Sequence, residues 1–142
     1  MILILDTDTL TILQRQTEPE HSRLHARLSV YPQENVCTTV VSFEEQMRGW
    51  LSTIARSKNK VQQVAAYQRL YNLLTFFSSI PVIGYDDVAA ERFAALRRLR
   101  LHVGSMDLRI AAITLSKDGL LLSRNSKDFS RVPKLRVEDW TV

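Results

Sequence analysis

Four acidic residues stand where strands or helices could deliver them to one site. Asp6 directly follows an N-terminal apolar run, and Asp128 follows the run Leu120–Leu122 by a short turn. Glu45 and Asp107 stand in the first turns of two predicted helices. Clustered carboxylates repel one another unless a cation neutralises them, and Mg²⁺ or Mn²⁺ suits this task because these ions prefer oxygen ligands. The four acids are therefore candidate metal ligands and catalytic residues.

Each acid also has a purely structural interpretation. Ser42 and Glu45 have the spacing of a capping box, in which each side chain bonds the other residue's backbone N–H. Asp107 could simply favour the helix dipole, and Asp128 could be a solvated turn residue. Asp6 is the hardest to explain in this way, because an acid directly after a buried strand is partly buried itself and needs a partner.

The elements that would position these residues alternate between strands and helices. Apolar and β-branched runs predict four strands, with a candidate fifth, at 1–5, 36–41, 81–84, 120–122 and 135–137. Helical periodicity and capping signals predict a short turn at 9–14 and helices at 19–30, 42–56, 59–77, 86–101 and 106–116. The alternation indicates an α/β fold with a mostly parallel central sheet of four to five strands, flanked by helices. Ligands bind at the carboxyl ends of the strands in such sheets.

Two of the predicted helices have distinct apolar patterns. Residues 106–116 are apolar nearly all round, which predicts a central, buried helix with Ser105 as its cap. In the helix at 59–77, helical spacing relates six apolar residues that we expect to face the core: Val61, Val64, Ala65, Leu70, Leu74 and Phe77.

Composition narrows the class of protein. A chain of 142 residues, 45% hydrophobic and 24% charged, fits one globular domain spanning residues 1–142. No apolar run approaches the length of a membrane span, and no signal-peptide pattern precedes Asp6, so we expect a cytoplasmic protein. Cys37 stands alone, which excludes an internal disulfide and a Cys-rich zinc site and is typical of a small buried residue. The net charge of +4 suits an anionic partner such as RNA.

The order of the acidic motifs resembles the PIN-domain family, and specifically the VapC-type toxins. The similarity covers the whole chain in four segments and a closing Val-Glu-Asp-Trp: Asp6–Leu10, Thr39–Gly49, Gly104–Ala112, Leu122–Phe129 and Val137–Trp140. Asp8 departs from the asparagine usual in the family, and an extra negative charge there could tighten metal binding or shift the metal preference.

The resemblance implies a metal-dependent endoribonuclease, the toxin of a type II toxin–antitoxin pair, that cleaves RNA such as tRNA. It also implies a homodimer and a hetero-oligomer with a cognate VapB-like antitoxin. On this hypothesis Asp6 and Asp107 are the principal ligands of Mg²⁺ (or Mn²⁺), and Asp128 and Glu45 complete the site. Ser123 and Asn125 would orient ligands or water, although ordinary turn hydrogen bonding explains them equally well. Four arginines could hold the RNA backbone, although the first three could equally be a solvated helix end: Arg97, Arg98, Arg100 and Arg109.

Two rival functions and two minor patterns remain open. A haloacid-dehalogenase-like phosphatase begins with Asp-x-Asp-x-Thr, which Asp6 and Asp8 fit but Leu10 does not; the other rival is a catalytically silent PIN-like binding module. His21 and His25 have a zinc-ligand spacing, but without a third ligand nearby they are better explained as a surface pair. Five aromatic residues could stack bases, although their helical spacing favours a core or dimer interface: Trp50, Tyr67, Tyr71, Phe76 and Phe77.

Overall fold

The computed structural model describes residues 1–142 and contains one five-stranded, entirely parallel sheet. The strands lie in the order β3-β2-β1-β4-β5, so the first strand of the chain is central. Their bounds are β1 Leu3–Leu5, β2 Val36–Thr39, β3 Val82–Ile83, β4 Leu120–Leu122 and β5 Arg136–Glu138. The predicted α/β class and parallel sheet are confirmed, as is the candidate fifth strand.

The apolar runs of β1 and β4 are continuous because both faces of the sheet are covered. Ile4 and Leu121 point to one face, and Leu3, Leu5 and Leu122 point to the other. None of these five side chains is exposed to solvent. A strand buried on both faces needs apolar residues at every position, which explains the absence of polar alternation.

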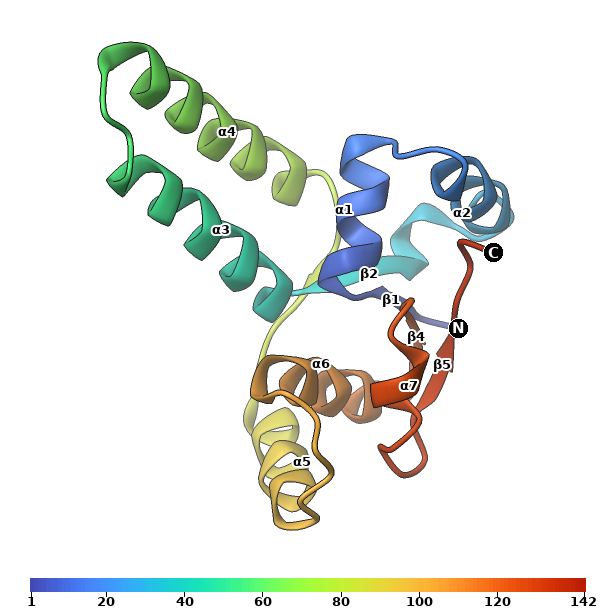
Figure 1. Ribbon diagram of the computed structural model, residues 1–142. Coiled ribbons are helices and arrows are strands. Elements are labelled where there is room, and N and C mark those ends of the chain that lie inside the picture. The colour runs from blue at the N-terminus through green and yellow to red at the C-terminus, as the bar shows by residue number, and fades with distance from the viewer.

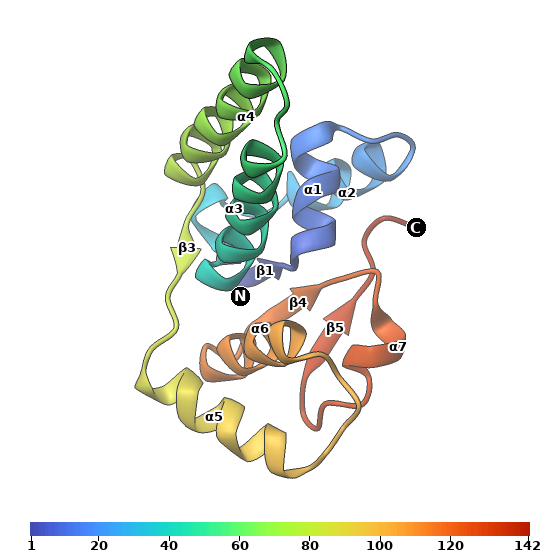
Figure 2. The same ribbon diagram turned by 60° about the vertical axis from the view of Figure 1, so that its left-hand side comes forward.

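Helices form a layer on each side of the sheet (Figures 1 and 2). Helices α1 (Thr7–Arg15) and α2 (Glu20–Leu28) bury Leu10 and Leu24 against the face of Leu3. Helices α5 (Asp87–Arg98) and α6 (Ser105–Ser116) bury Phe93 and Ile110 against the opposite face. Helix α1 is therefore a full helix, longer than the single turn predicted at 9–14.

Helix α6 is the buried central helix that its composition predicts, with six consecutive or nearly consecutive buried residues: Leu108, Ile110, Ala111, Ala112, Ile113 and Thr114. Its start differs from the prediction. The helix begins at Ser105, and Gly104 is the capping residue, with no side-chain hydrogen bond. The predicted cap at Ser105 is wrong because this residue already has helical geometry.

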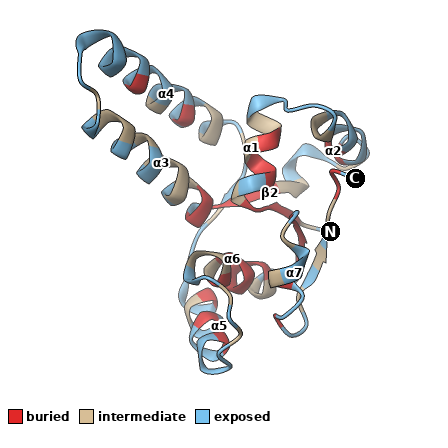
Figure 3. Cartoon of the chain, in the orientation of Figure 1, coloured by how far each residue is buried: buried red, intermediate tan, exposed pale blue.

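Helices α3 (Val40–Ala55) and α4 (Lys60–Ser78) form a hairpin that projects from the body of the molecule (Figure 1). The predicted inward face of α4 is wrong for Val61, Val64 and Leu74, whose exposed fractions are 79%, 62% and 60%. It is also wrong for Ala65, which is exposed. Ala66 and Leu73 are the buried residues of α4, and Figure 3 shows that most of this helix is exposed. Since α4 packs mainly on one helix, only a narrow stripe of it is covered.

Two short elements complete the chain: a 3₁₀ turn, η1 (Gln33–Asn35), and helix α7 (Ser126–Phe129). Cys37 on β2 is buried, as predicted. None of the helices is both long enough and apolar enough to span a lipid bilayer.

Candidate active site

Asp6 joins the end of β1 to the start of α1. It is the N-cap of α1, where its Oδ1 accepts a hydrogen bond from the Thr9 backbone N–H at 2.9 Å. Its Oδ2 accepts a bond from Ser123 Oγ at 2.6 Å. The residue is 4% exposed, and this burial raises its pKa, although the hydrogen bonds from Ser123 and Thr9 act in the opposite direction. The prediction of a buried acid with a partner is confirmed.

Asp107 lies in the first turn of α6, as predicted, and is half-buried. Its pKa is raised to about 6, mainly by burial and in addition by the negative charges of Asp6, Glu45 and Asp128, while the hydrogen bond from Asn125 acts in the opposite direction. Carboxylates have this effect only at short range. The structure therefore brings the side chains of all four candidate acids into one cluster, which we call the acidic cluster.

Glu45 reaches the acidic cluster from the second turn of α3. Its Oε1 accepts a hydrogen bond from Thr7 Oγ1 at 2.6 Å, and Thr7 Oγ1 lies 3.0 Å from Ser42 Oγ. The predicted capping box is wrong. Strand β2 ends at Thr39, and Thr39 is the N-cap of α3, accepting from the Ser42 backbone N–H at 3.1 Å. Glu45 is thereby free to face α1.

Asn125 bridges two of the acids. Its Nδ2 donates to Asp128 Oδ2 at 3.1 Å and to Asp107 Oδ2 at 3.4 Å. Asp128 lies in the short helix α7 and not in a solvated turn, and its Oδ1 is 3.5 Å from Arg131 Nη1. The amide thus holds together two carboxylates that would otherwise repel each other.

Ser123 connects this bridge to Asp6. Its hydroxyl donates to Asp6 and accepts from the Asn125 backbone N–H at 2.9 Å. The contact follows from the sheet register, in which Leu5 lies beside Leu122, so the residues after each strand end are neighbours. Ser123 and Asn125 therefore make hydrogen bonds within the site itself.

Two residues of this region escaped the sequence reasoning. Arg124 binds Asp8 with both ends of its guanidinium, Nε to Oδ2 at 2.7 Å and Nη2 to Oδ1 at 2.9 Å. Thr7 fixes Glu45. The positions of both residues in the sequence point to the site, because Thr7 stands between the two aspartates of the first motif and Arg124 follows Ser123. Their pairing, however, depends on the strand register.

The donor set of the acidic cluster fits a hard divalent cation. It offers carboxylate oxygens from four residues and the amide oxygen of Asn125, and a cation bound there would offset both the burial and the negative charges that raise the pKa of Asp107. As the side chains stand, no three of them form a ready set of ligands. Their rotamers would have to adjust, as partly exposed side chains can. His21 and His25 stack on α2 with ring centroids 5.7 Å apart, the surface pair that we expected.

The other candidates lie outside the cluster. Arg97, Arg98 and Arg100 are exposed at the end of α5 and just beyond it, and the Arg109 guanidinium lies 4.6 Å from the ring centroid of Phe93. Tyr67 and Tyr71 are exposed on α4, at 54% and 66%. The aromatic residues at the end of the hairpin pack on one another, with Phe76 and Phe77 rings 5.5 Å apart. Only some of the aromatic residues therefore pack within the hairpin, and the two tyrosines are exposed.

Comparison with known proteins agrees with the motif order. No protein-family model matches the chain. The tRNA(fMet)-specific endonuclease VapC of Salmonella typhimurium is 28% identical over 141 residues, covering 96% of each chain. Among solved structures, VapBC-1 from nontypeable Haemophilus influenzae superposes with a TM-score of 0.78 at 21% identity over the full length of both chains. The DNA-bound VapBC from Salmonella typhimurium gives 0.77 at 24% identity, covering 99% of this chain and 98% of that one. In its sequence, its fold and the order of its acidic residues, this chain is similar to the VapC-type proteins.

Proposed function

We propose that the chain is a metal-dependent endoribonuclease, the toxic component of a type II toxin–antitoxin system. The observation that carries the proposal is the acidic cluster, in which Asp6, Glu45 and Asp128 add their charge to the burial that raises the pKa of Asp107 to about 6. The name of the Salmonella relative, a tRNA-specific endonuclease, supports RNA as the substrate. Transfer RNA is accordingly the first substrate to test.

The proposed cation is Mg²⁺ or Mn²⁺, with Asp6 and Asp107 as principal ligands and Asp128 and Glu45 completing the site. When bound, the ion supplies Lewis acidity that lowers the pKa of a water molecule and stabilises charge on the scissile phosphate. The surrounding residues fix the ligands. Ser123 holds Asp6, Asn125 holds Asp107 and Asp128, and Thr7 holds Glu45.

Water is the nucleophile in this proposal. The Ser123 hydroxyl already donates a hydrogen bond to Asp6, and Cys37 lies in β2 with a pKa that burial raises. Neither side chain is activated for attack. Glu45 Oε2 makes no hydrogen bond, so this oxygen is available to accept one from a water molecule beside the scissile phosphate.

The proposed partners follow from the structural neighbours, which are VapBC complexes. We infer that a VapB-like antitoxin binds this chain in a hetero-oligomer and that the toxin itself is a homodimer. The molecule leaves apolar surface for such contacts on the outer face of α4, where Val64, Tyr67, Tyr71 and Leu74 are more than half exposed.

The phosphatase alternative finds no support in the geometry. Asp8 would be the second aspartate of that motif, but Arg124 binds both of its oxygens. Leu10, at the position of the required threonine, is fully buried in the apolar core. The silent binding module is separated from the nuclease only by the following experiment.

Substitution of the central acids tests the proposed nuclease directly. We expect Asp6→Asn and Asp107→Asn each to lower the rate of RNA cleavage in Mg²⁺ or Mn²⁺ by at least about 100-fold, and excess EDTA to abolish it. Asp118→Asn is the matched control, because the Asp118 side chain is 98% exposed and lies before β4, at the opposite end of that strand. Near wild-type rates in both cluster variants, or full activity in EDTA, would refute the mechanism. A wild-type protein that binds RNA or antitoxin but cuts nothing would be the silent module.

A further inference from the structure

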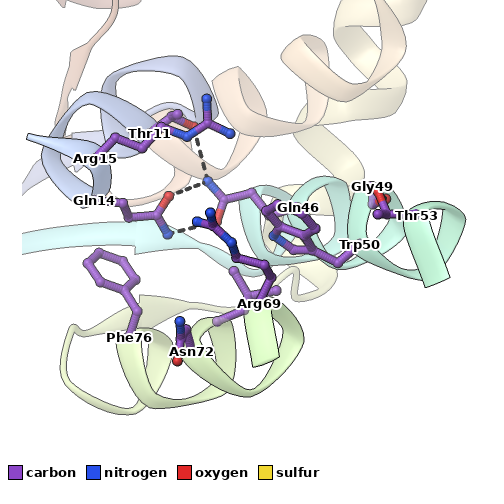
Figure 4. Close-up of a pocket in the computed structure, with 11 residues that line it drawn as sticks. Thr11, Gln14, Arg15, Gln46, Gly49, Trp50, Thr53, Arg69, Asn72 and Phe76 are labelled. Atoms are coloured by element: carbon purple, nitrogen blue, oxygen red, sulfur yellow. Dashed lines mark hydrogen bonds between the residues drawn. The ribbon is translucent and has the colours of Figure 1, made fainter. Parts of the chain in front are cut away.

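A second recess lies beside the acidic cluster, between α1, α3 and α4. This groove has a volume of about 560 Å³, within the range of ligand sites. Its lining includes Gln14, Arg15, Gln46, Trp50, Arg69 and Asn72. Figure 4 shows Arg69 reaching from α4 across the groove towards Gln46 and Trp50 on α3. We call it the hairpin groove.

The hairpin groove is continuous with the acidic cluster along two helices. At the cluster, Thr7 of α1 bonds Glu45 of α3. One turn further along α1, Gln46 Nε2 donates to Thr11 Oγ1 at 3.2 Å and to Gln14 Oε1 at 2.8 Å. Gln14 Nε2 donates back to Gln46 Oε1 at 2.8 Å. A strand whose scissile phosphate lies at the cluster can therefore extend directly into the groove.

The charge of the hairpin groove is opposite to that of the cluster. Arg15 and Arg69 are the charged residues in its lining, no acidic residue lines it, and neither arginine forms an ion pair. Two arginines near the cluster are already paired, Arg124 with Asp8 and Arg131 with Asp128. An RNA whose scissile phosphate lies beside a cluster of carboxylates needs cations at the neighbouring phosphates, and Arg15 and Arg69 of the groove are free to supply two of them.

The remaining lining suits nucleobases. Trp50 is half-buried, and the Arg69 guanidinium lies 5.9 Å from the centroid of its ring, an arrangement that can take a stacked base. The amides of Gln14, Gln46 and Asn72 offer both donors and acceptors, as base edges require. We propose that the hairpin groove binds the single-stranded RNA segment adjoining the scissile phosphate, with Arg15 and Arg69 on phosphates and Trp50 against a base. This inference rests on the proposed ribonuclease function.

Neutralising both arginines tests the charge part of the inference. In an Asp6→Asn background, which prevents cleavage, Arg15→Gln/Arg69→Gln should weaken binding of a single-stranded RNA. The dependence of log Kd on log salt concentration should become shallower by about 1.4, since each lost contact contributes about 0.7. Arg136→Gln is the control for the loss of one arginine charge elsewhere, because it lies at the start of β5, away from the carboxyl edge of the sheet. With Asp6 intact, the double variant should raise KM for long RNA and leave kcat unchanged.

A neutral steric variant tests the space itself. Gly49 of α3 lines the groove, and a Cβ built on it meets no atom within 4 Å. We expect Gly49→Gln to fill the groove and weaken RNA binding at least fivefold, whereas Gly49→Ala leaves affinity unchanged. Equal affinity in both Gly49 variants and in the double arginine variant would overturn the inference.

The outcomes also separate the groove from the nuclease and from a protein-binding surface. If the groove variants keep their RNA affinity but escape neutralisation by the cognate antitoxin, the groove binds protein and the inference is wrong. If the wild type cleaves RNA and the variants cleave it with unchanged KM, the inference fails while the proposed function stands. If the wild type neither binds nor cleaves RNA, the proposed function itself fails.

Discussion

Asp8 illustrates how one side-chain contact changes the interpretation of a motif. Asp8 stands where the VapC-type toxins usually have asparagine. An unpaired negative charge at this position would strengthen cation binding at the acidic cluster. Arg124 contacts both of its oxygens, and the charges of the pair largely cancel. In the wild-type protein the negative charge of Asp8 therefore contributes little to cation binding at the acidic cluster.

The pair can be dissected by substitution. We expect Arg124→Gln, which frees the Asp8 charge, to lower the Mg²⁺ concentration for half-maximal RNA cleavage by up to about fivefold, equivalent to about 1 kcal/mol for an exposed charge. The double variant Asp8→Asn/Arg124→Gln should return it to the wild-type value. Both concentrations are read from Mg²⁺ titrations of the cleavage rate. A higher Mg²⁺ requirement in Arg124→Gln would show instead that Arg124 serves to hold residues 123–125 in place.

Among elements, the junction of β2 and α3 controls where Glu45 points. Val40 and Val41 are β-branched, and the sequence patterns extend the strand through them and start the helix with a Ser42–Glu45 box. The same segment also contains Thr39, which can cap a helix that starts earlier. The structure adopts the second alternative, because Thr39 is buried at the strand end with its hydroxyl on the Ser42 N–H. Local patterns alone could not rank the two caps.

Removal of this cap should weaken the junction. We expect Thr39→Ala to lower the free energy of unfolding by about 1 kcal/mol, because the Ser42 N–H loses its acceptor in a buried setting. Thr39→Ser keeps a hydroxyl and should recover most of the loss. Urea denaturation of both variants measures the difference, and equal midpoints for Thr39→Ala and the wild type would contradict the assigned cap.

The α3–α4 hairpin shows a second limit of periodicity. The pattern at 59–77 correctly predicts a helix, α4, but it does not reveal which side is covered. Tertiary contacts decide which side of α4 is covered. This helix packs mainly on α3, and its buried residues are Ala66 and Leu73. By contrast, α6 is apolar on all sides, so its burial is predictable without knowing its neighbours.

At the scale of the whole molecule, parallel topology brings the acidic cluster together. A parallel sheet gathers the segments after its strands at one edge, so the meeting of Asp6 with the segment after β4 is predictable from strand order. The individual bonds are not predictable, because they depend on register and rotamers, as the bridge from Asn125 to Asp107 and Asp128 shows. The location of the site can therefore be predicted from the sequence, whereas the hydrogen bonds within it cannot.

The folding stability of the metal-free molecule should depend on the charge of this cluster. The pKa of Asp107 is raised from 3.8 to about 6, so the folded state binds its proton more tightly than the unfolded state. This contribution favours folding below about pH 4 and is lost as the pH rises through 6. Ionised Asp107 thus costs stability at neutral pH.

Replacing Asp107 should remove that cost. We expect Asp107→Asn in EDTA to gain about 1–2 kcal/mol of unfolding free energy at pH 7.5, less than the full linkage value because the carboxyl group is partly in water. The gain should shrink as the pH approaches 4. Urea titrations at the two pH values measure it, and Asp118→Asn serves as the exposed control. A gain that is the same at both pH values would mean that the charge of Asp107 is not the cause.

The hydrogen-bonded link from Ser123 to Asp6 spans 117 positions of the chain. During synthesis on the ribosome, Asp6 and Glu45 emerge long before residues 123–128 exist. If the chain is the proposed ribonuclease, it is therefore unable to cleave the RNA of the ribosome that is making it until its final strands have been translated. On the same proposal, this interval gives the antitoxin time to bind the polypeptide before the site is complete.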